Sequence, residues 1–375
     1  MDERRKMIHR SHKIQLKPNN HQSTYFAKAC GVSRLAYNWG LNRWKEMYEA
    51  KEKTSGRIIR KEFTRIKREQ FPFVTEVTKC APDSSFDNLN KAFQNFFRNV
   101  KKGRKPGYPK FKKKGTHDIF TIDNSKFSVE GKKIRIPKLG WVRLTEELRF
   151  NGKIMSATVS KTADKWFVAI LVELPDEDKS KNQTLPSVGV DLGISKLATL
   201  SDGVVFENIK TTKKFERRLR RLNKSLARKV KGSNRWKRAK LYLSRLHYKI
   251  GCVRNDVLHK MTRFIADNYS TVCLEDLNTS GMLKNKHLSK AISDVSFGEI
   301  RRQLSYKSYA VHFVNRFFPS TKLCMTCGKK HDMPLHKRIF ECCEGPIDRD
   351  LHAAQNILRQ GLAEVKRMEM KALAC

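Results

Sequence analysis

The stretch "SVGVDLGISKLATLSDGVVF" (residues 187–206) places a carboxylate inside a run of apolar residues. Short apolar runs over 188–192, 195–201 and 204–207 are separated by glycine-containing turns, which predicts an antiparallel meander of three strands. Asp191 would end the first strand. An aspartate beside a glycine is often only a turn residue, so its role depends on which other side chains the fold brings to that strand end.

The rest of this half of the chain supplies those side chains. A basic helical region is expected over 212–268, and a buried strand over 270–277 contains Glu275. A helix at 296–309 and a strand at 311–317 follow, and "DRDLHAAQNI" begins a last helix. Three antiparallel strands, a helix and then further strands each followed by a helix are typical of an RNase H-like domain. In that order the strands ending in carboxylates lie side by side.

Asp191, Glu275 and Asp350 would then meet where the last helix begins. Three such carboxylates can hold two Mg²⁺ ions, one activating water and the other stabilising the leaving oxygen of a phosphodiester. Each residue also has a simpler interpretation. Glu275 next to Asp276 could be a solvated pair at a strand end, and Asp348 and Asp350 could be helix-start charges favoured by the helix dipole.

The charge of the chain indicates a polyanionic partner. Lysine and arginine number 79 against 37 acidic residues, a formal net charge of +42. Self-repulsion at this charge destabilises a compact protein, and nucleic-acid phosphates are the natural counter-charge. The sequence has no apolar run of about 18 residues and no apolar signal core near its first residues. We therefore expect a cytoplasmic protein with no membrane partner.

One segment concentrates the basic residues. Residues 211–250 contain a single acidic residue, Glu216, and their apolar positions recur at helical spacing. A solvated charged helix usually mixes signs, so we interpret the other faces as a surface that follows phosphates without specifying sequence. The candidates for these contacts are Lys213, Lys214, Arg217, Arg218, Arg221, Arg228, Arg235 and Lys237.

The cysteine pattern indicates a metal site. A Cys-x-x-Cys-Gly turn precedes two adjacent cysteines, and four thiolates around one centre form a closed, structural zinc site; the four are Cys324, Cys327, Cys342 and Cys343. Adjacent cysteines are not the usual spacing. One of them could be a bystander, with His331 or His336 as the fourth ligand, and the first pair could instead be a surface redox pair.

The first half of the chain has a different pattern. Residues 10–18 alternate like a strand, and 21–100 are helical in periodicity, with one helix start at "PDSS" (82–85). A basic Gly- and Pro-containing loop follows, and then short alternating runs that predict a small β-barrel or sheet. The first strand would complete that sheet, with the helical block inserted. The polar segment 175–187 predicts a domain boundary.

At this point the chain resembles the TnpB family, transposon-encoded RNA-guided nucleases related to type V CRISPR effectors. The resemblance covers nearly the whole chain. The stretches that carry it are "LAYNWGLNRW", "LNKAFQNFF", "GYPKFKKK", "IPKLGWVRL", "GVDLGISKLATLSDG", "CLEDLNTSGM", "SFGEIRRQLSYKS", "FFPSTKLCMTCG" and "DRDLHAAQNI".

The resemblance implies an α+β multidomain protein. A RuvC-type, RNase H-like nuclease domain would carry a zinc-ribbon insert, and an N-terminal wedge β-barrel would be interrupted by a helical recognition domain. The expected bounds are 1–18 and 110–180 for the wedge, 19–109 for the recognition domain, 186–319 and 347–375 for the nuclease domain, and 320–346 for the zinc insert.

The resemblance also implies an activity and its residues. Asp191, Glu275 and Asp350 would be the Mg²⁺ ligands, with Asp350 rather than Asp348 because the family's acid is the second aspartate of Asp-Arg-Asp. The protein would act as a monomeric ribonucleoprotein with a guide RNA from the transposon end, in the cytoplasm of a prokaryote at its nucleoid. It would cleave double-stranded DNA next to a short target-adjacent motif.

Two positions fall where the family contacts that motif, Lys79 and Thr121, although Cys80 and Asp83 are atypical there. A further departure is His352, which stands where the family usually has asparagine and would change the surroundings of the metal.

Two other functions compete with the nuclease. The first is an RNA-guided DNA-binding repressor that has lost cleavage, which the intact set of three acids disfavours. The second is a transposase that joins DNA ends, for which the sequence has no separate tyrosine–histidine cassette.

Overall fold

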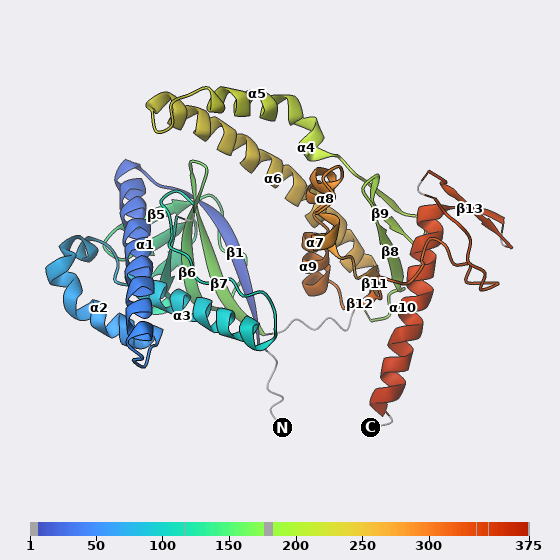
Figure 1. Cartoon of the computed structure of the whole chain (residues 1–375), viewed down its shortest axis with the longest axis horizontal. Helices are drawn as coiled ribbons and strands as arrows, with labels where there is room; N and C mark the ends of the chain where they lie inside the picture. The colour runs from blue at the N-terminus through green and yellow to red at the C-terminus, as the bar shows by residue number, and fades with distance from the viewer. Residues whose placement is uncertain (1–6, 117, 176–182, 335, 344, 374–375) are drawn as a thin grey trace. The chain divides into compact units, whose positions relative to one another are not determined.

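The computed structural model describes residues 7–116, 118–175, 183–334, 336–343 and 345–373. The chain divides into two compact units, residues 1–176 and 177–375. This division falls within the predicted linker, of which residues 176–182 lie outside the described part of the chain. Figure 1 labels the elements of each unit.

The first unit contains a seven-stranded antiparallel sheet in the order β2-β6-β7-β1-β5-β4-β3. Strand β1, which precedes the helical block in the sequence, lies between β7 and β5, so it completes the sheet as predicted. The strands are β1 (Met7–Lys17), β2 (Ile119–Asp123), β3 (Ser128–Glu130), β4 (Lys133–Ile136), β5 (Gly140–Leu144), β6 (Lys153–Thr162) and β7 (Lys165–Pro175).

The inserted helices are α1 (Asn20–Glu49), α2 (Gly56–Gln70) and α3 (Cys80–Lys101), with a 3₁₀ turn at Pro72–Glu76. Phe26 of α1 is fully buried, and its ring lies 5.1 Å from that of Trp166 in β7, which joins helix and sheet in one core. The predicted helix start at 82–85 is wrong. Helix α3 begins earlier because Pro82, with its fixed φ, is tolerated in a first turn.

The second unit contains a five-stranded sheet in the order β10-β9-β8-β11-β12. The predicted meander is confirmed, because β8 pairs antiparallel with β9 and β9 with β10, whereas β8, β11 and β12 are parallel. The strands are β8 (Val188–Leu192), β9 (Lys196–Leu200), β10 (Val205–Glu207), β11 (Thr271–Glu275) and β12 (Ala310–Val314).

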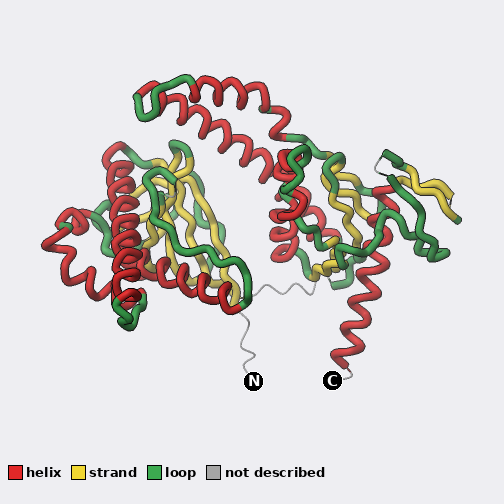
Figure 2. The backbone as a smooth tube through the Cα atoms, viewed as in Figure 1, coloured by secondary structure: helices red, strands yellow, loops and turns green. Residues whose placement is uncertain are grey.

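Helices surround this sheet, and a separate hairpin pairs β13 (Ile339–Cys342) with β14 (Gly345–Asp348). Figure 2 shows two long helices, α5 and α6, joined by a loop. The helices are α4 (Thr211–Lys214), α5 (Glu216–Ala227), α6 (Asn234–Asn268), α7 (Thr279–Met282), α8 (Ser289–Val295), α9 (Phe297–Lys307) and α10 (Arg349–Leu373). Within the described ranges, none of the helices is long and apolar enough to cross a bilayer.

The two faces of the sheet have different partners because side chains alternate along a strand. Val188 and Val190 of β8 belong to one buried cluster together with Ile265 of α6 and Ile300 of α9. On the other face Cys273 of β11 packs in a second cluster with a residue of α10. The sheet is therefore a middle layer between α6 and α9 on one side and α10 on the other.

Helix α10 approaches the sheet unusually closely. A Cβ atom on Gly189 of β8 would lie 2.0 Å from the carbonyl oxygen of Ala354, and one on Gly361 of α10 would lie 2.5 Å from Cys273 Sγ. Neither distance is compatible with a side chain. Glycine at these two positions is therefore what lets the helix rest against β8 and β11.

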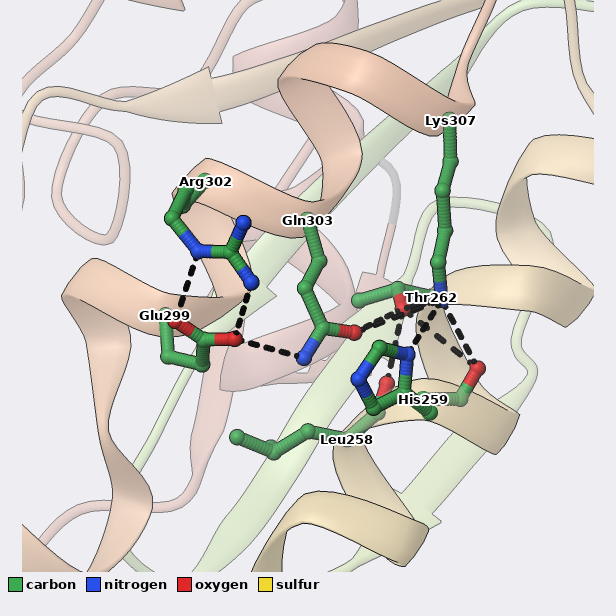
Figure 3. A network of polar contacts seen from close by, with 7 residues as sticks. All are labelled: Leu258, His259, Thr262, Glu299, Arg302, Gln303 and Lys307. Carbon is green, nitrogen blue, oxygen red and sulfur yellow. Dashed lines mark hydrogen bonds and ion pairs between the residues drawn. The ribbon is translucent and has the colours of Figure 1, made fainter. Parts of the chain in front are cut away.

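Polar contacts join α6 to α9 (Figure 3). The ammonium group of Lys307 donates to Thr262 Oγ1 at 2.7 Å and to the carbonyl oxygen of His259 at 3.1 Å. Gln303 Nε2 donates to Glu299 Oε1 at 2.9 Å. Burial lowers the pKa of Lys307 to about 8, because removing the ammonium group from water disfavours its charged form. The network adds directional contacts to the apolar packing of the two helices.

We predict that Gly189→Ala destabilises the second unit by about 1–3 kcal/mol, because the added methyl group forces α10 away from β8. Thermal and urea unfolding would measure the loss. Gly251→Ala is the matched control, since a Cβ at this α6 position meets nothing within 4 Å and alanine should stabilise the helix slightly. Equal stability of Gly189→Ala and wild type would contradict the close approach.

Candidate functional site

Asp191 and Glu275 stand at the carboxyl ends of two adjacent parallel strands. Strands β8 and β11 pair with Val190 opposite Leu274, and the next residue on each strand is the acid. Both acids therefore lie on the sheet face that also carries Gly189 and is covered by α10. The structure brings together these two predicted residues, although they are far apart in the sequence.

Asp350 reaches the same region from the first turn of α10, which contacts β8 and β11. The other aspartate of this motif has a different task. Asp348 Oδ1 accepts hydrogen bonds from the backbone N–H groups of Asp350 at 2.9 Å and Leu351 at 3.1 Å, so it caps the helix. The geometry favours Asp350 over Asp348 as a member of the site.

The electrostatics of the three acids are those of a crowded anionic site. Burial and, after it, the negative charges of Glu275 and Asp350 together raise the pKa of Asp191 to about 7. Burial also raises the pKa of Glu275, partly offset by a hydrogen bond from Ser320 Oγ. A bound cation would relieve this repulsion, because it favours the ionised form of every carboxylate around it.

The three acids do not form one compact cluster of ligand atoms. Among the described residues, the one group of three or more potential ligands within 4.8 Å of each other consists of cysteines. Two catalytic metal ions stand about 3.5–4 Å apart, so a set of acids that serves both need not be that compact. Hard carboxylate oxygens on three elements fit Mg²⁺.

Several residues of the site were not predicted from the sequence. Lys196 Nζ lies 3.2 Å from Asp348 Oδ2 and 3.9 Å from Asp350 Oδ2. Ser320 donates to Glu275, and its own carbonyl oxygen accepts a 2.7 Å hydrogen bond from Asn356 Nδ2 of α10. The signals were present, since Lys196 opens the strand beside Asp191 and Ser320 lies within "FFPSTKLC". Their partners became visible only in three dimensions.

The four cysteines form the expected cluster, with all four sulfur atoms within 4.8 Å of one another. The Sγ atoms of Cys324 and Cys343 are 3.5 Å apart, and those of Cys327 and Cys342 are 3.4 Å apart. Tetrahedral zinc with Zn–S bonds of about 2.3 Å separates its sulfur ligands by roughly 3.8 Å. Backbone N–H groups, foremost that of Cys327, lower the pKa of Cys324 to about 6, which favours the thiolate that binds metal. The cluster is thus suited to zinc.

The histidines near this cluster have separate roles. His331 Nε2 lies 3.1 Å from Cys342 Sγ, so it can donate a hydrogen bond to a ligating thiolate, whereas His336 is exposed. His352 is buried, and its ring stacks on Phe340 of β13 at 3.7 Å between centroids. This contact connects α10 to the cysteine hairpin, a structural reason for histidine at this position.

The predicted phosphate-contacting residues lie on α4, α5 and the start of α6 and in the loop between the two longer helices. All eight are exposed: Lys213, Lys214, Arg217, Arg218, Arg221, Arg228, Arg235 and Lys237. A surface hollow of about 500 Å³ along α5 is lined by basic side chains including Arg217, Arg221 and Arg228. Helix α5 lies in contact with α6, and these cations are exposed to solvent.

Lys79 and Thr121 lie in the first unit, on elements that pack against each other. Lys79 is exposed at the start of α3, and Thr121 is half-buried in β2 with its hydroxyl 3.2 Å from that of Thr158. The atypical neighbours have structural partners, because Cys80 is buried in the core and Asp83 pairs with Arg60 at 2.9 Å.

Comparison with known proteins identifies the family. A family model described as "Probable transposase" matches residues 169–286, and one described as "Cas12f1-like, TNB domain" matches 297–357. A protein named "Putative RNA-guided DNA endonuclease InsQ" from Escherichia coli (strain K12) is 31% identical over 96% of this chain and 94% of its own length. The chain belongs to the TnpB family.

Other matches agree with this assignment. A "Putative RNA-guided DNA endonuclease" from Streptomyces pristinaespiralis is 33% identical over 95% of the chain and 90% of its own length. The cryo-EM structure of the Cas12f1-sgRNA-target DNA complex contains a chain of similar fold, with a TM-score of 0.55 at 14% identity over 90% of the TnpB-family chain and 83% of the other.

A third family model, "Helix-turn-helix domain", matches residues 7–53. In this TnpB-family chain that range contains strand β1 and the uninterrupted helix α1. Apolar residues continue along the length of α1 and pack on α3 and the sheet, so a turn within it would expose part of the core.

We predict about one zinc ion per chain by elemental analysis of protein purified under reducing conditions. Cys343→Ser should lower the zinc content if all four cysteines are ligands, because it removes one of four thiolates. The exposed Cys252 provides the control Cys252→Ser, which should retain the metal. Loss of zinc from His331→Ala but not from Cys343→Ser would instead identify the histidine as the fourth ligand.

We also predict that Asp191→Asn raises the melting temperature of the metal-free protein at pH 8. The pKa of Asp191 in the folded protein, about 7, exceeds the ordinary aspartate value of 3.8. The stability contributed by the protonated carboxyl is therefore full below about pH 3.8 and is lost as the pH rises through 7. Asparagine removes the charge that costs stability at pH 8.

Magnesium should raise the melting temperature of the wild type and have less effect on Asp191→Asn, since ligands that bind the native state stabilise it. The exposed Asp267, which pairs with Arg263 at 2.6 Å, provides the control Asp267→Asn, whose response to magnesium should match wild type. A lower melting temperature for Asp191→Asn without metal would contradict the crowded anionic site.

Proposed function

We propose that this TnpB-family chain is an RNA-guided DNA endonuclease that cleaves double-stranded DNA next to a short target-adjacent motif. One observation carries the proposal. Three acids from separate segments, Asp191, Glu275 and Asp350, converge at the carboxyl ends of β8 and β11 and at the start of α10. A carboxylate whose pKa is raised by burial and by neighbouring acids, as that of Asp191 is, is typical of sites that bind cations for phosphoryl chemistry.

The strand order of the second unit supports an RNase H-like nuclease domain. An antiparallel meander followed by parallel strands, with acids at adjacent strand ends, is the arrangement expected for residues 186–319 and 347–375. The cysteine cluster belongs to the insert over 320–346. We assign the sheet of the first unit to a wedge domain (1–18 and 110–180) and α1–α3 to a recognition domain (19–109).

Two Mg²⁺ ions bound by these acids would supply a nucleophilic water and stabilise the leaving oxygen. The residues of the chain would hold and orient that centre. Ser320 fixes the carboxylate of Glu275 by a hydrogen bond, and Asn356 in turn holds the backbone of Ser320. Lys196, close to Asp350, would limit the negative charge that a DNA phosphate meets on approach.

The partners follow from charge and relatives. The relatives named RNA-guided DNA endonucleases and the fold shared with a chain of an RNA and DNA complex support a guide RNA and a DNA target. We propose that the chain acts on them as a monomeric ribonucleoprotein. The exposed cations of α4–α6 would follow a phosphate backbone. Base pairing would read the target, and Lys79 and Thr121 would contribute to reading the short motif.

We predict that Asp191→Ala, Glu275→Gln and Asp350→Asn each abolish cleavage but leave RNA and target binding within about twofold of wild type, because they remove cation ligands and no phosphate contact. The protein would be expressed with its native flanking DNA, and its bound RNA sequenced and used to guide cleavage of a matching duplex. Gel-shift titration of the same complexes would measure binding.

Asp348→Asn is the matched control, because this neighbouring acid caps α10 and should retain cleavage at a rate reduced by less than tenfold. A wild type that binds a discrete RNA and its target but never cleaves would support the repressor function instead. Cleavage that persists in Asp191→Ala would refute the assignment of the centre.

A further inference from the structure

A cavity of about 310 Å³ has Glu275, one of the three acids, in its wall. It lies at the carboxyl ends of the parallel strands, between β11, β12 and α9, and its lining includes Leu192, Glu275, Phe297, Arg301 and Arg316. Its volume is at the lower end of the range for small-ligand pockets. One nucleotide of a single strand fits this size, whereas a duplex does not.

Two arginines of this cavity wall, from different elements, converge on the carboxylate of Asp276. Arg301 of α9 donates to Asp276 Oδ1 at 2.5 Å, and Arg316, which follows β12, donates to Asp276 Oδ2. The guanidinium of Arg301 also lies 3.9 Å from the ring centroid of Phe313. These contacts fix the direction of both guanidinium groups, although the two side chains are 47% and 41% exposed.

The group keeps a net positive charge. The two guanidinium groups hold the pKa of Asp276 below its usual value, so two cations face one anion. Each guanidinium has five N–H donors, and one hydrogen bond from each to Asp276 leaves most of them for another acceptor. Planar, pre-oriented guanidinium groups are the side chains best suited to bind a phosphate by paired hydrogen bonds.

We propose that Arg301 and Arg316, held in position by Asp276, bind a backbone phosphate of the cleaved strand, one position away from the phosphate at the carboxylates. The proposal rests on the proposed nuclease function. Its physical reason is that an anionic centre repels the strand it must hold, and a cationic pair beside Glu275 offsets that repulsion. The adjoining cavity receives the nucleotide attached to that phosphate.

The main experiment neutralises one phosphate at a time. Target strands carrying a single methylphosphonate at successive positions around the cut would be cleaved by the guided complex under single-turnover conditions. In wild type, a methylphosphonate at one position beside the cut should slow cleavage about tenfold to hundredfold, because charge-assisted hydrogen bonds are lost. The double variant Arg301→Gln/Arg316→Gln should be equally slow on the unmodified strand and lose nothing more from that modification.

Arg302→Gln is the matched control. It removes the same charge from the adjacent residue of α9, where Arg302 pairs with Glu299 at 2.7 Å and is not part of the cavity wall. It should show the wild-type sensitivity at every position. A double variant that stays as sensitive as wild type, or an equal loss in Arg302→Gln, would overturn the proposal.

A second measurement does not depend on cleavage. Binding of a short single-stranded oligonucleotide would be measured in EDTA at several salt concentrations for the full chain. Each phosphate contact contributes about 0.7 to the slope of log K against log salt for single strands, so the double variant should have a slope smaller by about 0.7. An unchanged slope would refute the arginine site, whether or not the wild type cleaves DNA.

Melting curves of the same variants test for a purely structural role. Arg316→Lys keeps the charge but loses the paired geometry. This variant should fold like wild type and cleave at a rate between those of the double variant and wild type. If slow cleavage in the double variant comes only from loosened packing of α9, its melting temperature will fall and the methylphosphonate effect will persist. That outcome would also overturn the proposal.

Discussion

The site depends on the contact between α10 and the sheet. Gly189 and Gly361 allow the helix backbone to approach to a distance at which any Cβ atom would collide. This contact sets the position of Asp350 relative to the acids on β8 and β11. Helix α10 also carries Asn356, whose side-chain amide donates a hydrogen bond to the carbonyl oxygen of Ser320. A single close-packed interface therefore arranges acids that belong to three separate elements.

A second constraint is electrostatic. The chain carries a formal net charge of +42, yet its proposed centre is a partly buried group of acids. These two features are compatible because the exposed cations and the acids would bind different groups. Exposed cations on α4–α6 suit long stretches of phosphate backbone, whereas the acids suit divalent cations. The arginine pair at Asp276 lines the same cavity as Glu275, one of these acids.

The agreement between prediction and structure differs among the residues. Asp191 and Glu275 were predictable because strand ends are visible as apolar runs that stop at a charge, and parallel neighbours align those ends. Asp348 and Asp350 were harder to separate, because both precede a helix and only the hydrogen bonds show which one caps it. The start of α3 was predicted too late, because the sequence does not show whether a proline precedes a helix or lies within its first turn, as Pro82 does.

The sequence by itself determined the periodicities, the metal-ligand types, the excess of positive charge and the order of elements, since each is a local property of neighbouring residues. The tertiary structure decided which distant side chains meet. The adjacent cysteines point into one cluster, His352 stacks in a structural contact, and Arg301 and Arg316 share one carboxylate. Such pairings depend on how helices and strands pack, and no short stretch of sequence encodes the distance between two elements.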